Sequence, residues 1–247
     1  MSPIEKPDPW VELSRFTAAR IALGRTGGSL RTDSLLDFRL AHARARDAVA
    51  LPFDAPALAH ALGELALPTC PLATQAADRG AFLLNPELGR RLRGDSLERL
   101  GALGADWGSR DLCIVVSDGL SALAAHRQVV PLLRALVPQL VKGGVSMYPI
   151  FVVPFARVKL GDELGETLGA AQSLILLGER PGLSSPDSLG AYVTFKPRTT
   201  CSDADRNCVS NIRPEGLPPE EAARSLARLL SESARLGQSG VALKLGA

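Results

Sequence analysis

Two stretches decide the fold of this chain: ARVKLGDELGE at residues 156–166 and LLGERPGL at residues 176–183. In order, they predict the end of a strand, a loop, a short helix and a second strand that is buried. Glu179 and Arg180 follow this second strand directly, and a proline and a glycine then stiffen the turn. Ligands of open α/β sheets bind at the carboxyl ends of the strands, and packing alone explains a charged pair there poorly. We therefore interpret the exit of this strand as a candidate binding site.

The same alternation of strands and helices extends through residues 106–247. Residues 112–116 form a short continuous apolar run, which is typical of a strand buried on both faces. Short connections between alternating elements imply a parallel sheet with right-handed crossovers. The predicted fold class is α/β, with a Rossmann-like parallel-sheet domain over residues 106–247. Further strands are predicted at residues 150–153, 174–177 and 191–195, with an edge element near Val209 and Ile212. Helices are predicted at residues 122–142, where Pro131 and Pro138 should split the helix, at residues 162–170 and from Pro218 onward.

Residues 1–105 are predicted to form a helical N-terminal region that docks on another subunit. The pattern allows one short strand at residues 82–84, but we expect no strand of this region to join the sheet. Apolar faces on an appended region often mark partner contacts, although such helices can also simply cover one face of a sheet. Helices are expected at residues 10–23, 32–49, 56–67, 86–92 and 96–103. The first should end at Gly24. The second should be capped by Thr32 and carry an apolar stripe of Leu36, Leu40, Ala43 and Ala48.

The bulk composition excludes several classes of protein. Hydrophobic side chains make up 46% and charged ones 22% of the 247 residues, an ordinary balance for a globular chain. The net charge is +2 and the arginines are scattered among acidic residues, so we expect no nucleic-acid partner. No apolar run has the length of a transmembrane helix, and residues 1–10 lack the apolar core of a secretory signal. The four cysteines contain no C-x-x-C spacing, which predicts no zinc site and a reducing, intracellular setting.

The polar segment SDGLS at residues 117–121 follows a predicted buried strand and opens a helix. Its backbone N–H groups and hydroxyls can hold a phosphate or an amide group of a ligand. A helix cap followed by a tight turn uses the same residues, and taken alone this second interpretation is favoured. The segment does not match G-x-G-x-x-G, so a nicotinamide dinucleotide site has little support. No Ser-His-Asp set, carboxylate pair or H-E-x-x-H motif is evident, which predicts no catalytic residues and no metal ligands.

Several further segments occur in a fixed order along the chain. They are GRTG at residues 24–27, the predicted helix at 37–49, NPELGRRL at 85–92, DRNCVSNI at 205–212 and PPEEAA at 218–223. Together with SDGLS and the two stretches quoted first, they resemble the small subunit of ethanolamine ammonia-lyase, an adenosylcobalamin-dependent enzyme. The resemblance spans about residues 20–230 and departs at the ends and between residues 51 and 80. No segment is decisive alone, but their order and number make the match specific.

The resemblance implies that Val158, Glu179 and Cys208 contact cobalamin. Taken without it, Val158 is a core valine, Glu179 an ion-pair partner of Arg180 or another basic residue, and Cys208 a buried structural thiol. The resemblance also implies a hetero-oligomer in which a large TIM-barrel subunit holds the substrate and supplies the reacting side chains. That enzyme converts ethanolamine to acetaldehyde and ammonia by a radical mechanism. The implied location is a bacterial microcompartment or the cytoplasm.

The sequence around each histidine predicts whether a protein side chain would be the lower ligand of cobalt. Cobalamin proteins that supply a histidine ligand to cobalt share a D-x-H-x-x-G motif. The residues two positions before His42, His60 and His126 are Leu40, Leu58 and Ala124. Since none is aspartate, we expect the cofactor to keep its own dimethylbenzimidazole as the lower ligand, the base-on state.

Two alternatives from other classes remain. The chain could be a stand-alone Rossmann-like protein that binds a nucleotide or a sugar phosphate, or a non-catalytic assembly protein whose helices dock on a partner. Cobalamin bound only in the presence of a barrel subunit favours the ammonia-lyase interpretation, whereas a nucleotide bound to the isolated chain favours the first alternative.

Overall fold

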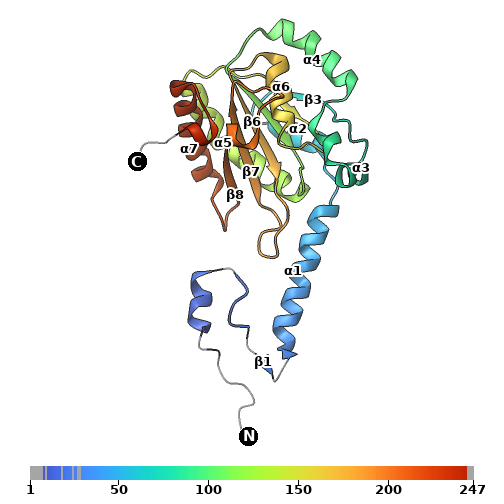
Figure 1. The fold of residues 1–247 in the computed structure, drawn as a ribbon, viewed down its shortest axis with the longest axis vertical. Helices are drawn as coiled ribbons and strands as arrows, with labels where there is room; N and C mark the ends of the chain where they lie inside the picture. The colour runs from blue at the N-terminus through green and yellow to red at the C-terminus, as the bar shows by residue number, and fades with distance from the viewer. Residues whose placement is uncertain (1–7, 9, 18, 24, 27–28, 244–247) are drawn as a thin grey trace.

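The computed structural model describes residues 8, 10–17, 19–23, 25–26 and 29–243. A six-stranded sheet in the order β3-β5-β4-β6-β7-β8 forms its centre (Figure 1). The first four of these strands run parallel, and β7 runs antiparallel to both of its neighbours. The mixed α/β class predicted from the sequence is therefore confirmed. The strands are β3 (Thr69–Pro71), β4 (Leu112–Ser117), β5 (Ile150–Val152), β6 (Gln172–Gly178), β7 (Leu189–Phe195) and β8 (Arg206–Ile212).

The prediction of a wholly parallel sheet is wrong at β7. Residues 179–188 connect β6 to β7 and contain no helix. A parallel connection needs a crossover of about a dozen residues or more, usually with a helix, so this short link returns the chain in the opposite direction. The backbone N–H of Glu179 donates to the carbonyl of Ser188 at 2.9 Å and closes the resulting hairpin.

Helices cover both faces of the sheet, and each face has its own core. Ile114 and Val116 of β4 belong to one core, and Cys113 and Val115 belong to the other. All four side chains are fully buried, which explains the continuous apolar run of this strand. The first core lies under α5 (Ala122–Lys142), α7 (Pro219–Leu236) and α2 (Ala55–Gly63), and the second under α4 (Gly94–Trp107) and α6 (Leu160–Leu168). None of the helices in the described part of the chain is long and apolar enough to cross a membrane.

The prediction that Pro131 and Pro138 split the second long helix is wrong, because α5 continues through both. A proline inside a helix frees the carbonyl four residues earlier, here those of Arg127 and Arg134. Both arginines are exposed, so water can bind these carbonyls. The opposite face of α5 is fully buried, and its packing outweighs the two lost hydrogen bonds.

The N-terminal third contributes to the sheet, contrary to the sequence prediction. β3 pairs in parallel with β5 at one edge. Three residues that include a proline are too few to give a strand pattern in the sequence. Residues 82–84 are helical and not a strand, since Asp78 caps α3 (Arg79–Leu84) by accepting the N–H of Ala81 at 2.8 Å. The remaining short helices are η2 (Pro86–Arg90), η3 (Asp203–Asp205) and η4 (Gly240–Ala242).

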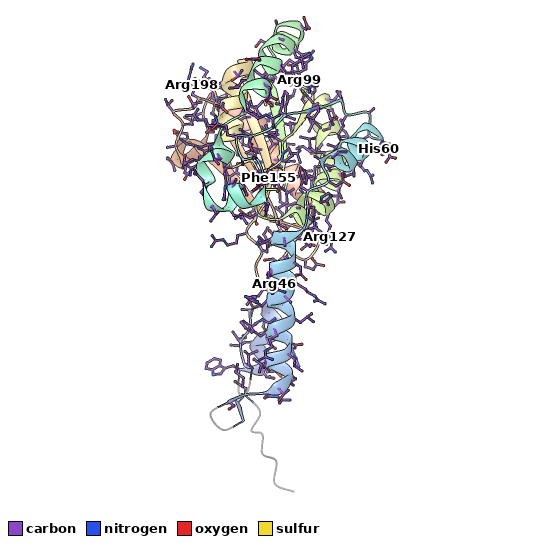
Figure 2. All side chains as sticks on the ribbon, turned by 90° about the vertical axis from the view of Figure 1, so that its right-hand side faces the viewer. Arg46, His60, Arg99, Arg127, Phe155 and Arg198 are labelled. Atoms are coloured by element: carbon purple, nitrogen blue, oxygen red, sulfur yellow. The ribbon has the colours of Figure 1, made fainter. Side chains whose placement is uncertain are left out.

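The helix α1 (Thr32–Ala50) projects away from the sheet domain, as Figures 1 and 2 show from two sides. Arg20 and the carbonyl of Leu23 make hydrogen bonds to α1. Thr32 is its first helical residue and not its cap. The helix predicted at residues 10–23 is limited to η1 (Val11–Phe16), and its expected end, Gly24, lies outside the described residues. Before α1, β1 (Arg25–Thr26) pairs antiparallel with β2 (Ser29–Leu30).

The predicted apolar stripe of α1 is largely uncovered in the single chain. Leu36 is 57% exposed and Leu40 is 50% exposed, whereas Ala48 near the sheet domain is buried. Phe38 on the same part of α1 is also exposed. The far half of α1 therefore presents large apolar side chains to solvent.

Candidate functional site

The candidate site lies where the connections of the sheet change direction. The chain leaves β4 toward β5 by way of α5, and it leaves β5 by way of α6 to reach β6 on the other side of β4. The connections that follow the adjacent strands β4 and β6 therefore lead to opposite sides of the sheet, and ligands of open α/β sheets usually bind at such a point. A pocket of about 340 Å³ opens at this place. Its lining comes from Gly119, Leu120, Ala156, Arg157, Val158, Leu177, Gly178, Glu179, Arg180 and Tyr192.

Two glycines let the loops at the floor of this pocket touch. Gly119 has a φ of +49°, and a Cβ on it would lie 2.5 Å from the carbonyl oxygen of Gly178. A Cβ on Gly178 would lie 2.1 Å from the carbonyl oxygen of Ser121. The carbonyl of Gly178 instead accepts the N–H of Leu120 at 2.8 Å. Glycine is needed at both positions because the backbones of the two strand exits are in contact.

Ser117 and Asp118 fix the loop that follows β5. The Oγ of Ser117 accepts the N–H of Ala156 at 2.9 Å, and Oδ1 of Asp118 accepts the N–H of Phe155 at 2.7 Å. Ser121 caps α5 by accepting the N–H of Ala124 at 3.2 Å. The cap and tight-turn interpretation of SDGLS is therefore confirmed. The segment contributes to the pocket mainly by placing the loop that carries Arg157 and Val158.

Glu179 is held through one carboxylate oxygen and leaves the other open. Its Oε2 accepts hydrogen bonds from the hydroxyl of Ser188 and from the N–H of Asn211, the latter at 3.3 Å. Its Oε1 lies over Gly190, where a Cβ would come within 2.9 Å. Among the described residues no donor reaches Oε1, and no basic side chain forms an ion pair with Glu179. The predicted alternative, an ion pair with Arg180 or another basic residue, is therefore absent from this part of the chain.

Val158 lines the same pocket as Glu179, whereas Cys208 does not line it but stands opposite Tyr192, which does. Val158 is half-buried, and its backbone N–H donates to no atom of the described residues. Cys208 is exposed on β8 and not a buried thiol, and its Sγ lies 3.1 Å from Oγ of Ser210. Partial desolvation raises the pKa of Cys208, so it is a neutral thiol near pH 7.

Tyr192 is the pocket residue that sequence reasoning missed. It stands opposite Cys208 in the β7–β8 register and lines the pocket beside Glu179. Burial, together with Cys208 and Glu179, raises the pKa of its hydroxyl, which therefore stays protonated. The only signal in the sequence was its position in a predicted strand, which does not indicate the face to which a side chain points.

The described residues contain no group of three or more His, Cys, Asp or Glu side chains that could hold a metal ion. The three histidines lie on three different helices and have local partners. His42 stacks on Phe38, His60 lies 3.6 Å from Glu64, and Nε2 of His126 accepts the N–H of Asp54 at 3.1 Å. The pocket offers hydrogen-bonding groups and two arginines, an arrangement suited to binding.

Comparisons with known proteins agree over nearly the whole chain. The model of the family described as "Ethanolamine ammonia-lyase light chain" matches residues 7–244. A protein of Azotobacter vinelandii named "Ethanolamine ammonia-lyase small subunit" is 52% identical over 242 residues, which cover 96% of this chain and 88% of that protein. Proteins of the same name from Pseudomonas fluorescens strain Pf-5 and Pseudomonas aeruginosa strain PAO1 are 50% and 51% identical, and this chain covers 89% and 87% of their lengths.

Proposed function

The chain belongs to the ethanolamine ammonia-lyase light-chain family, and from this premise we propose that it holds cobalamin against the large subunit of that enzyme. The observation that carries the proposal is the pocket at the exits of β4 and β6, with the open Oε1 of Glu179 in its wall. Pockets at this place in an α/β sheet commonly bind ligands, and binding alone requires no catalytic side chain.

The residues of the pocket fit the edge of a corrinoid. Cobalamin carries neutral carboxamide side chains around an apolar ring, so it needs both hydrogen-bond acceptors and donors. Oε1 of Glu179 can accept an amide N–H, and the free N–H of Val158 can donate to an amide oxygen. Cys208 and Tyr192 extend the same surface along β7 and β8.

The size of the pocket supports a shared site. A volume of about 340 Å³ holds only part of a corrinoid. We infer that a second protein surface, that of the TIM-barrel large subunit, covers the rest. Bound adenosylcobalamin supplies the radical chemistry that converts ethanolamine to acetaldehyde and ammonia. The residues of this chain bind and orient the cofactor and exclude water from it.

We further propose that α1 is part of the contact with the large subunit. The exposed Leu36, Phe38 and Leu40 lie on a helix that projects from the sheet domain (Figure 1). The last turn of α1 adjoins the pocket, because Arg79 donates to the carbonyl of Val49 through Nε and, through Nη1, to the carbonyl of Gly119, which lines the pocket. A partner that covers the pocket can therefore reach α1 as well.

The test is to purify the chain alone and together with the large subunit, and to record visible absorption after adding cobalamin. We expect the corrinoid spectrum in the complex and not with the isolated chain. The isolated chain with adenosylcobalamin should not turn over ethanolamine. A complex that binds no cobalamin, or a nucleotide bound to the lone chain, contradicts the proposal.

A further inference from the structure

Two arginines share one aromatic ring beside the pocket. The guanidinium carbon of Arg157 lies 4.3 Å from the centroid of the Phe82 ring, and that of Arg79 lies 5.3 Å from it. Each guanidinium also has a buried nitrogen without a hydrogen-bond acceptor, Nε of Arg157 and Nη2 of Arg79. A buried donor of a charged group is costly when it is unsatisfied, and among the described residues these two nitrogens have no acceptor.

The carboxylates nearby leave part of the arginine charge unpaired, and Glu179, which lines the same pocket, forms no ion pair with a described residue. Asp118 pairs with Nη1 of Arg79 at 2.9 Å, and Glu87 pairs with Arg90 at 2.6 Å. Arg157 forms no hydrogen bond or ion pair through its guanidinium with any described residue, and Arg180 forms no ion pair with one. Burial and the charges of Arg79, Arg90 and Arg180 lower the pKa of Arg157, and Asp118 opposes this effect.

Arg157 and Arg180 reach the same pocket from different loops. Arg157 is in the loop after β5, Arg180 is in the loop after β6, and both line the pocket. Guanidinium groups that approach from two directions suit a tetrahedral oxyanion better than a planar carboxylate, which one arginine can satisfy alone. Stacking on Phe82 holds the guanidinium of Arg157 in position before a ligand binds.

We propose that Arg157 and Arg180 form an oxyanion site that takes a phosphodiester. This deepens the proposed function, because the nucleotide loop of cobalamin contains a phosphodiester while its corrin side chains are neutral amides. The two arginines would then hold the nucleotide end of the cofactor, and Glu179 with Val158 would hold its amides. A free phosphate has the same chemistry, so the experiment separates the two sources.

The experiment uses the complex with the large subunit and two corrinoids, cyanocobalamin and dicyanocobinamide, which lacks the nucleotide loop with its phosphodiester. Binding is followed by visible absorption. Arg157→Gln should weaken cyanocobalamin about 10- to 100-fold, which is the loss expected for a charge-assisted hydrogen bond, and change dicyanocobinamide less than about twofold. Arg180→Gln should act in the same direction, and Arg157→Lys should recover part of the loss. Arg224→Gln, an exposed arginine on α7, is the matched control and should change neither.

Equal losses for both corrinoids, or no loss for either, overturn the inference while leaving the proposed function in place. A loss of association with the large subunit alone would mean that Arg157 pairs with a carboxylate of the partner, which also overturns it. If the wild-type complex binds neither corrinoid, the proposed function fails. The oxyanion site is then tested by measuring the Tm of the chain with inorganic phosphate. A phosphate-dependent increase in the Tm of the wild type that Arg157→Gln abolishes supports the site, and the absence of an increase refutes it.

Discussion

The carboxylate of Asp118 joins the exit of β4 to the backbone of Phe155 in the loop after β5, with an Oδ1 to N distance of 2.7 Å. The same carboxylate binds Nη1 of Arg79 through Oδ2 at 2.9 Å. Asp118 is only 1% exposed, and burial raises its pKa while Phe155 and Arg79 oppose that rise. One buried acid therefore places both the loop of Val158 and the arginine that adjoins α1.

We expect Asp118→Asn to lower the free energy of unfolding by about 3 kcal/mol, because it removes the charged partner of a largely buried arginine. Urea denaturation of the purified chain measures this. Arg79→Gln is the matched variant, and the double variant should lose less than the sum of the two single variants. Additive losses would show that the two side chains act independently.

Glu179→Ala should weaken coenzyme binding more than folding. Loss of one charge-assisted hydrogen bond costs about 1.5–3 kcal/mol, or about one to two decades in affinity. A cobalamin titration of the assembled enzyme measures the effect. Glu98→Gln on α4, an exposed acid without an ion pair among the described residues, should bind cobalamin as the wild type does. An unchanged dissociation constant for Glu179→Ala would leave this residue only a structural role in the β6–β7 hairpin.

The sequence predicted the centre of the sheet because strands buried on both faces leave continuous apolar runs, as residues 112–116 and 174–177 do. It also predicted that Glu179 lies at a strand exit, and the parallel order of β5, β4 and β6 brings it to the same pocket as Val158. β8 is the edge strand, as expected near Val209 and Ile212, but the sequence pattern does not indicate that the side chain of Cys208 lies on an uncovered face of this strand.

Other features had no local signal. β3 is too short to show a period, and the direction of β7 depends on the length of the preceding turn and not on its own residues. Tyr192 and the arginine pair on Phe82 come together only in the folded chain, from segments far apart in the sequence.

Gly178→Ala should destabilise the chain by about 3 kcal/mol, the upper range for overpacking, because the new methyl group meets the backbone at the pocket floor. Gly101→Ala is the control. A Cβ there has no neighbour within 4 Å and the position lies inside α4, so stability should rise by about 0.5–1 kcal/mol. Thermal unfolding of both variants measures the difference. A Gly178→Ala chain as stable as the wild type would show that the β4 and β6 exits can separate without cost.

Electron paramagnetic resonance of the cob(II)alamin state should show base-on binding. None of the three histidines follows the D-x-H-x-x-G pattern, and His126 already accepts a hydrogen bond from Asp54. The complex is prepared with ¹⁵N-labelled protein and unlabelled cobalamin. Hyperfine splitting from ¹⁴N of dimethylbenzimidazole is expected. Splitting from ¹⁵N would instead identify a protein histidine as the lower ligand.

The last prediction concerns α1. Truncation at residue 106 is not a clean test of docking, because it would also remove β3 from the sheet. Leu36→Glu and Leu40→Glu in the full chain are sharper, since both side chains are at least half exposed and their replacement should cost the isolated chain less than about 0.5 kcal/mol.

If α1 docks on the large subunit, each of these substitutions buries a charge in an apolar contact. We therefore expect the two variants to keep the wild-type Tm and to lose co-purification with the large subunit, and with it the cobalamin spectrum. Val241→Glu is the matched control, because Val241 is 81% exposed and lies in η4, which contacts η3 and β8. A lowered Tm without loss of assembly would mean that Leu36 and Leu40 support the fold of the chain itself. Normal assembly with an unchanged Tm would exclude this face of α1 from the contact.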